Sequence, residues 1–127
     1  MAVLVSKRYF QLLIVEDEAI NRMILQQYLQ NLGIHADEAT SGEEALRMVR
    51  AVDYHLILMD IHMPGMDGRQ TTRHIRSWPQ AKYQIMPIIA LTAEEEFTTT
   101  DALFTSIVTK PYNAGVLENM LRPYVRI

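Results

Sequence analysis

The chain has 127 residues, of which 49% are hydrophobic and 21% charged, and its formal net charge at pH 7 is −3. These values fit one ordinary globular domain with its own core, and the negative charge argues against a nucleic-acid-binding surface. The absence of cysteine excludes disulfides and thiolate metal sites, and no apolar run approaches the roughly 20 residues of a membrane span.

The chain begins with a short segment that carries no clear targeting signal. Met1–Phe10 is too short for a secretory signal and lacks a small-residue cleavage site. We interpret residues 1–9 as a linker or strand lead-in and residues 10–127 as a single domain. We expect that domain to make no direct membrane contact.

Three short segments are almost wholly apolar: Leu12–Val15, Leu56–Met59 and Ile88–Leu91. Runs of this length without polar alternation predict strands that are buried on both faces, as in a parallel sheet covered by helices. Ile34–Ala39 and Ile107–Val108 are weaker strand candidates.

Helical patterns separate these segments. Apolar residues repeat at helical spacing from Ile20 to Leu32, and Gly33 stands where a C-terminal cap is expected. Thr98–Thr100 is a poor helical run, so the fourth helix, over about Ala93–Leu103, has the weakest pattern. The five predicted helices begin near Ile20, Ser41, Asp67, Ala93 and Asn113. Strand and helix thus alternate five times, which predicts a doubly wound α/β fold with helices on both faces.

Polar residues follow the predicted strands. Glu16 and Asp17 come after the first strand, Asp60 after the third, Thr92 after the fourth and Lys110 after the last. In open α/β sheets the carboxyl ends of the strands border the crevice where ligands bind, so these side chains are expected to meet. Taken singly, each has an ordinary explanation: a helix cap for Thr92, the helix dipole for the acidic pair, a surface position for Lys110.

Three carboxylates in one place need a counter-ion or raised pKa values. Hard oxygen ligands favour magnesium, manganese or calcium over zinc. With a metal ion bound, one carboxylate could attack a phosphoryl donor while Lys110 and Thr92 stabilise the phosphoryl oxygens. These residues together therefore predict metal-dependent phosphoryl transfer to a carboxylate.

At these residues the sequence resembles the response-regulator receiver family of two-component signalling. The segments that carry the resemblance are Leu12–Glu18, Leu58–Gly68, Ala90–Ala93 and Thr109–Pro111. The likeness extends from about Phe10 to Tyr124. It implies a five-stranded parallel sheet in the order 2-1-3-4-5, surrounded by five helices.

The resemblance also implies a role for each site residue. Asp60 would be the phosphoacceptor and Asp17 a direct Mg²⁺ ligand, with Mn²⁺ as a possible substitute. Glu16 would act largely through metal-bound water, and the His62 carbonyl would complete the ligands. The remaining implied roles are phosphate contact by Thr92 and Lys110, and a cis peptide bond at Lys110–Pro111.

Two features concern what happens after phosphorylation. Ile107 stands where the family usually places an aromatic switch residue, and Leu103 and Phe104 replace small residues, so we expect a different output surface or a phosphorelay role. His62 and Glu94 stand where related domains flank the path of the attacking water. We predict that these two residues tune the lifetime of the acyl phosphate.

Within the family, the segments Glu16–Asn21, Thr71–Arg76 and Pro87–Ala93 look like receivers of hybrid histidine kinases. This implies a cytoplasmic domain that catalyses its own phosphorylation and dephosphorylation but is not a multiple-turnover enzyme by itself. Its partner would be a histidine kinase core or a histidine phosphotransfer domain. A stand-alone response regulator is the alternative context. Competing classes are an aspartyl-phosphate phosphatase, a nucleotide- or flavin-binding domain and a receiver that no longer takes phosphate.

Overall fold

Five strands form one parallel sheet in the computed structural model, which describes residues 4–93 and 102–127. The order across the sheet is β3-β2-β4-β5-β6, and every neighbouring pair is parallel. The strands are β2 (Leu12–Val15), β3 (Ala36–Ala39), β4 (Leu56–Asp60), β5 (Ile88–Thr92) and β6 (Ser106–Thr109). The predicted order 2-1-3-4-5 is confirmed, because a short extra strand precedes these five and shifts their numbers by one.

That extra strand, β1 (Val5–Ser6), pairs in parallel with β7 (Val125–Arg126) at the other end of the chain. Neither strand was predicted. β1 falls inside the segment 1–9 that the sequence indicates as a linker or lead-in. Two-residue strands carry no periodic pattern, so only their tertiary pairing reveals them.

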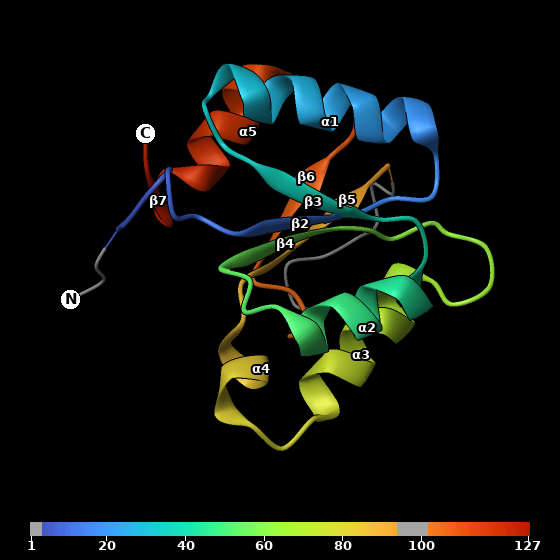
Figure 1. The fold of residues 1–127 in the computed structure, drawn as a ribbon. Helices are drawn as coiled ribbons and strands as arrows, with labels where there is room; N and C mark the ends of the chain where they lie inside the picture. Colours follow the sequence, from blue (N-terminus) through green and yellow to red (C-terminus); the bar gives the residue numbers. More distant parts are fainter. Residues whose placement is uncertain (1–3, 94–101) are drawn as a thin grey trace.

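Helices cover both faces of the sheet (Figure 1). Within the described residues they are α1 (Ala19–Asn31), α2 (Gly42–Ala51), α3 (Gly68–Ser77), α4 (Ala81–Ile85) and α5 (Ala114–Leu121). α1 and α5 lie on one face, and α2, α3 and α4 lie on the other. This arrangement confirms the doubly wound α/β prediction. None of the helices in the described part of the chain is long and apolar enough to cross a membrane.

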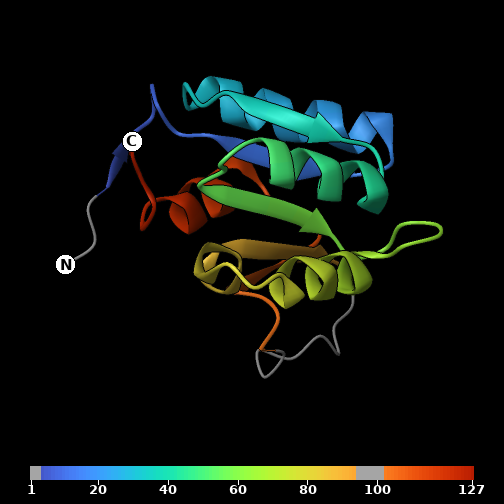
Figure 2. The ribbon, with the colours of Figure 1, turned by 60° about the horizontal axis from the view of Figure 1, so that its bottom comes forward.

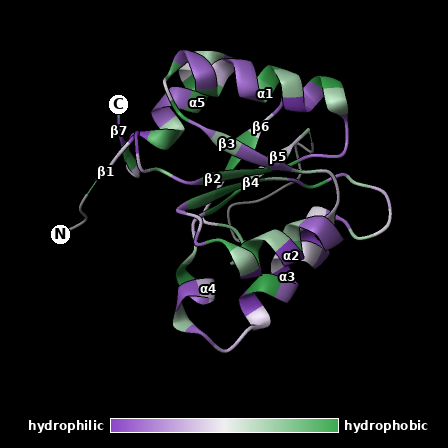
Figure 3. Cartoon of the chain, viewed as in Figure 1, coloured by the Kyte–Doolittle hydropathy of each residue, from purple (hydrophilic) through white to green (hydrophobic). Residues whose placement is uncertain are grey.

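The core has two layers, one on each face of the sheet. Successive strand residues point to opposite faces, so Leu13 and Val15 join the layer under α2 and α3, while Leu12 and Ile14 join the layer under α1 and α5. Every residue of β2, β4 and β5 is buried. Figure 3 shows β2 and β4 as hydrophobic strands between helices of mixed character. The burial of both faces explains why these strands are continuous apolar runs.

Side-chain caps fix the starts of three helices. Asp67 and Gln70 form a full capping box at α3, and the Asn113 side chain accepts from the Val116 N–H at α5. At α2 the Ser41 hydroxyl accepts from the Glu44 N–H at 3.1 Å. The Glu44 carboxylate bonds the N–H of Thr40 instead of that of Ser41, so the box is displaced by one residue.

The fourth helix differs from its prediction. The structure has the short helix α4 before β5, between Pro79 and Pro87, where no helix was predicted. The helix predicted over about Ala93–Leu103 falls largely on residues 94–101, which lie outside the described residues. At its described ends, Ala93 and Leu103 are not helical.

Candidate active site

The carboxyl ends of four strands bring the predicted site residues together. Glu16 and Asp17 follow β2, and Asp60 ends β4. One carboxylate oxygen from each of these three residues lies within 4.8 Å of the others. The loop that follows β4 projects beyond the end of the sheet, as Figure 2 shows in light green.

Asp60 is only 3% exposed. Its Oδ1 lies 3.3 Å from the ammonium nitrogen of Lys110, and the backbone N–H of His62 donates to the same oxygen at 3.4 Å. Asp60 is thus a buried carboxylate that contacts one charged and one neutral donor.

Glu16 is more deeply buried than Asp60, at 1% exposure, and its Oε1 lies 3.8 Å from the Lys110 ammonium. Burial, together with the hydrogen bond and negative charge of Asp60, raises the pKa of Glu16 from 4.5 to about 8, against the opposing effect of Lys110. The two carboxylates therefore compete for one ammonium group. A further positive charge in the cluster would relieve that competition.

Among the described residues, two oxygens of the cluster have no hydrogen-bond partner. They are Glu16 Oε2 and Asp17 Oδ1, and both are buried. A buried carboxylate oxygen without a partner is costly unless it binds a cation. Hard oxygen donors of this kind suit Mg²⁺, so the residues present fit the metal that the sequence predicts. Thr72 also has an unpartnered buried oxygen.

Thr92 ends β5, and Lys110 directly follows the neighbouring strand β6. Thr92 is fully buried, and its carbonyl accepts from the Lys110 N–H at 2.8 Å, which continues the pairing of the two strands. The Lys110–Pro111 peptide bond is cis, the isomer implied by the resemblance.

The residues predicted to act after phosphorylation are spread around the cluster. His62 is exposed beside Asp60. Ile107 is half-buried in β6 and packs against the core layer under α2 and α3, which also contains Phe104. Glu94 lies outside the described residues.

Sequence reasoning missed two neighbours of the cluster. Tyr112 packs edge-on against Tyr28, 6.4 Å between ring centres, and burial raises the pKa of its hydroxyl above the usual value. The Arg22 guanidinium reaches the backbone of Glu16 and Asp17. Its position in the first turns of α1 was the available signal, because helical side chains lean toward the N-terminus of their helix.

The fold and site define a doubly wound α/β domain with an acidic, metal-competent cluster at the carboxyl end of its sheet. The family model described as "Response regulator receiver domain" matches residues 12–122. The chain therefore belongs to the response regulator receiver domain family.

Curated relatives include kinases and a transcriptional regulator. Sensor histidine kinase GacS of Pseudomonas protegens is 35% identical over 121 residues, which are 91% of this chain and 13% of that kinase. Transcriptional regulatory protein ResD of Bacillus subtilis is 41% identical over 86 residues, 68% of this chain and 34% of that protein. The chain thus spans about an eighth of the kinase that it matches.

Solved receiver structures share the fold. The receiver domain of a sensor histidine kinase from Pseudomonas aeruginosa, with a magnesium ion coordinated in its active-site cleft, has a TM-score of 0.81 at 30% identity and covers 91% of this chain and 96% of its own. Response regulator TrrA of Thermotoga maritima, in complex with Mg²⁺ and BeF, has a TM-score of 0.79 at 31% identity, with coverage of 89% and 96%.

Proposed function

We propose that this domain accepts a phosphoryl group from a phosphohistidine onto Asp60 in a Mg²⁺-dependent reaction. The observation that carries the proposal is the arrangement around Asp60. Its carboxylate contacts both an ammonium group and a backbone amide, and it adjoins two buried carboxylate oxygens without partners.

In the proposed step, an Asp60 carboxylate oxygen forms a bond to phosphorus as the phosphorus–nitrogen bond of the donor breaks. The bonding electron pair remains on the imidazole nitrogen. Lys110 neutralises the charge on the phosphoryl oxygens, and the Thr92 hydroxyl donates a hydrogen bond to one of them.

Glu16, Asp17, Asp60 and the His62 carbonyl would hold the metal ion. When bound, Mg²⁺ supplies positive charge that offsets the negative charge of the carboxylates and of the phosphoryl group. Mn²⁺, which accepts the same oxygen ligands, would be a substitute.

Phosphorylation would replace the single negative charge of the Asp60 carboxylate with a phosphoryl group that carries roughly −1.5 to −2 at neutral pH. A change of this size can draw in a loop or repack a neighbouring surface. Ile107 lacks the ring of an aromatic switch, so we propose a relay role or a different output surface. His62 and Glu94 are proposed to set the lifetime of the acyl phosphate.

We further propose that the domain works within a hybrid sensor histidine kinase, on the cytoplasmic side of the membrane. Several relatives are sensor kinases, and GacS matches over 91% of this chain, against 68% for ResD. The partner would be a histidine kinase core or a histidine phosphotransfer domain. The resemblance to ResD supports the alternative that the domain belongs to a response regulator separate from its kinase.

The direct test is incubation of the chain with Mg²⁺ and acetyl phosphate, followed by intact mass measurement. We expect one phosphoryl group per chain, lost in Asp60→Asn and prevented by a chelator. Asp53→Asn is the matched control, because this exposed carboxylate pairs with Lys82 on the surface. Labelling that persists in Asp60→Asn, or that needs no divalent metal, would contradict the proposal.

A phosphomonoester assay separates this function from the phosphatase alternative. Within the lifetime of its acyl phosphate, a phosphoacceptor domain should release at most about one equivalent of product per chain. Sustained multiple turnover that depends on Asp60 would favour the enzyme.

A further inference from the structure

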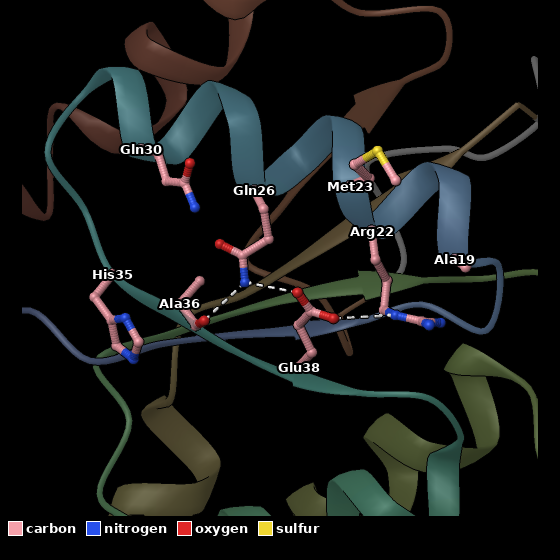
Figure 4. Close-up of a pocket in the computed structure, with 8 residues that line it drawn as sticks. All are labelled: Ala19, Arg22, Met23, Gln26, Gln30, His35, Ala36 and Glu38. Carbon is pink, nitrogen blue, oxygen red and sulfur yellow. Dashed lines mark hydrogen bonds and ion pairs between the residues drawn. The ribbon is translucent and has the colours of Figure 1, made fainter.

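A run of polar contacts crosses the groove between α1 and the edge strand β3 (Figure 4). The groove has a volume of about 420 Å³. Gln26 Nε2 donates to the Ala36 carbonyl and to Glu38 Oε2, both at 2.8 Å. Arg22 Nε donates to Glu38 Oε1 at 3.1 Å. The contacts tie α1 to β3.

The same arginine also contacts the acid cluster, through the backbone of two of its residues. Arg22 Nη1 donates to the backbone carbonyls of Glu16 and Asp17, each at 2.9 Å. Its side chain is 17% exposed, and that of Glu38 is 39% exposed. One guanidinium thus joins both acidic residues of the loop to the edge of the sheet.

These contacts fix the backbone on both sides of Glu16. The Glu16 N–H donates to the Ala39 carbonyl at 3.0 Å, and its own carbonyl is held by Arg22. The start of α1 adds no capping bond to the loop, because the side chain of the N-cap residue Glu18 makes none in the part of the chain that the structure describes. The Arg22 guanidinium therefore fixes the backbone of the loop between β2 and α1.

We propose that Arg22 is a positioning residue that sets the affinity of the acid cluster for Mg²⁺. Glu16 and Asp17 carry the two buried oxygens without partners, and a rotation of either peptide group would move those oxygens. Groups that orient metal ligands commonly change metal affinity by about ten- to a hundredfold when they are removed. The inference rests on the proposed Mg²⁺-dependent function.

The positioning role has its own signature. If Arg22 acted only through its charge, its removal would tighten Mg²⁺ binding, since a guanidinium repels a divalent cation. If it served only the stability of the fold, the folded variant would bind Mg²⁺ as the unchanged chain does. Only a positioning role for Arg22 predicts that a variant without it stays folded and binds Mg²⁺ more weakly.

The experiment is a titration of the 127-residue chain with Mg²⁺ alone, followed by backbone amide NMR signals. We expect Arg22→Met to weaken Mg²⁺ binding by about ten- to a hundredfold. Arg47→Met is the matched control, since it removes an equal charge from an exposed position on α2 and should bind normally. Unchanged or tighter binding by Arg22→Met would overturn the proposal.

Two further variants separate geometry from charge and guard against misfolding. Arg22→Lys keeps the charge but carries all its donors on one nitrogen, so it cannot reproduce the separate contacts of Nε and Nη1 and should also weaken Mg²⁺ binding. Glu38→Gln keeps an acceptor for Arg22 Nε, so its affinity should stay close to normal. Thermal unfolding without Mg²⁺ checks the fold. If Arg22→Met does not fold, Arg22→Lys decides, and normal binding by Arg22→Lys refutes positioning.

The outcome is distinguishable from failure of the proposed function. Normal Mg²⁺ binding by the folded Arg22 variants, with Asp60 still labelled by acetyl phosphate, would refute the role of Arg22 alone. Failure of the unchanged chain to take a phosphoryl group would refute the proposed function itself.

Discussion

At the residue scale, Gly68 shows how closely the backbone passes the candidate phosphoacceptor. A Cβ built on Gly68 would lie 2.3 Å from the Asp60 carbonyl oxygen and 2.9 Å from the Ile61 Cα. Both atoms belong to the backbone, which cannot turn aside as a flexible side chain can. The first residue of α3 is therefore glycine because of this close approach, with no need for a positive φ.

Gly68→Ala should disturb both stability and phosphorylation. We expect a loss of about 1–3 kcal/mol in the free energy of unfolding, because the backbone must shift to admit the methyl group. The rate of labelling by acetyl phosphate should fall, because the shift moves Asp60. Urea unfolding and the labelling assay measure the two effects.

Gly115→Ala is the matched control, as it places the same methyl group near the start of α5. The nearest atom to that Cβ is Asn113 Oδ1, at 3.3 Å. Its stability should change by no more than about 1 kcal/mol, with normal labelling. Equal effects of the two substitutions would contradict the close-approach argument.

At the element scale, one arginine donates to three carbonyls at the end of α4 and just after it. Arg76 of α3 donates from Nη1 to the carbonyls of Tyr83 and Met86, at 2.9 and 2.7 Å, and more weakly to that of Gln84 at 3.3 Å. Its Nε donates to the Leu103 carbonyl at 3.0 Å, which joins the segment before β6 to the same group. Burial lowers the pKa of this guanidinium. A five-residue helix is too short to be stable alone, so α4 depends on such contacts with the rest of the domain.

Arg76→Met should cost about 2–3 kcal/mol of unfolding free energy, since it leaves backbone carbonyls without a charged donor. Arg73→Met, on the exposed face of the same helix, should change stability by less than about 0.5 kcal/mol. Chemical unfolding of both variants measures the difference. Equal stability of the two would show that the carbonyls of α4 find other donors.

At the scale of the whole molecule, the acid cluster makes stability depend on pH. Without metal, the pKa of Glu16 is about 8 in the folded chain, against an ordinary value of 4.5. Between these values the folded state keeps a proton that the unfolded state releases. The contribution of Glu16 to stability is therefore complete below pH about 4.5 and is lost as the pH rises through about 8.

We expect the melting temperature of the metal-free chain to fall between pH 6 and 9 by more than that of Glu16→Gln, which cannot ionise. Thermal unfolding in the presence of a chelator measures both profiles. Glu43→Gln, an exposed substitution in the first turn of α2, should keep the steep profile. Parallel profiles for the unchanged chain and Glu16→Gln would contradict this assignment.

The whole fold also shows what the sequence could predict. The apolar runs at Leu12, Leu56 and Ile88 gave the buried strands, because burial on both faces requires them. Polar residues directly after these strands predicted the acid cluster, because the carboxyl ends of parallel strands lie at one edge of the sheet. The remainder depends on contacts between distant segments. The carbonyls of α4 are bound by Arg76, and β1 forms only by pairing with β7. In the sequence alone, Arg22 cannot be told from any other polar residue on a helix.

The pairing of β1 with β7 has a consequence for any longer protein that contains this domain. Arg126 Nη2 lies 3.5 Å from the Leu4 carbonyl, so the two ends of the described chain are neighbours. Figure 1 places them at the end of the sheet opposite the loop that follows β4. A donor domain attached at either end must pass the length of a strand, roughly 17 Å, to reach Asp60. If the donor group lay at the point of attachment, a tether of about five extended residues would be needed to span that distance. Linker length would therefore decide whether the effective concentration of the donor at Asp60 is high or close to zero.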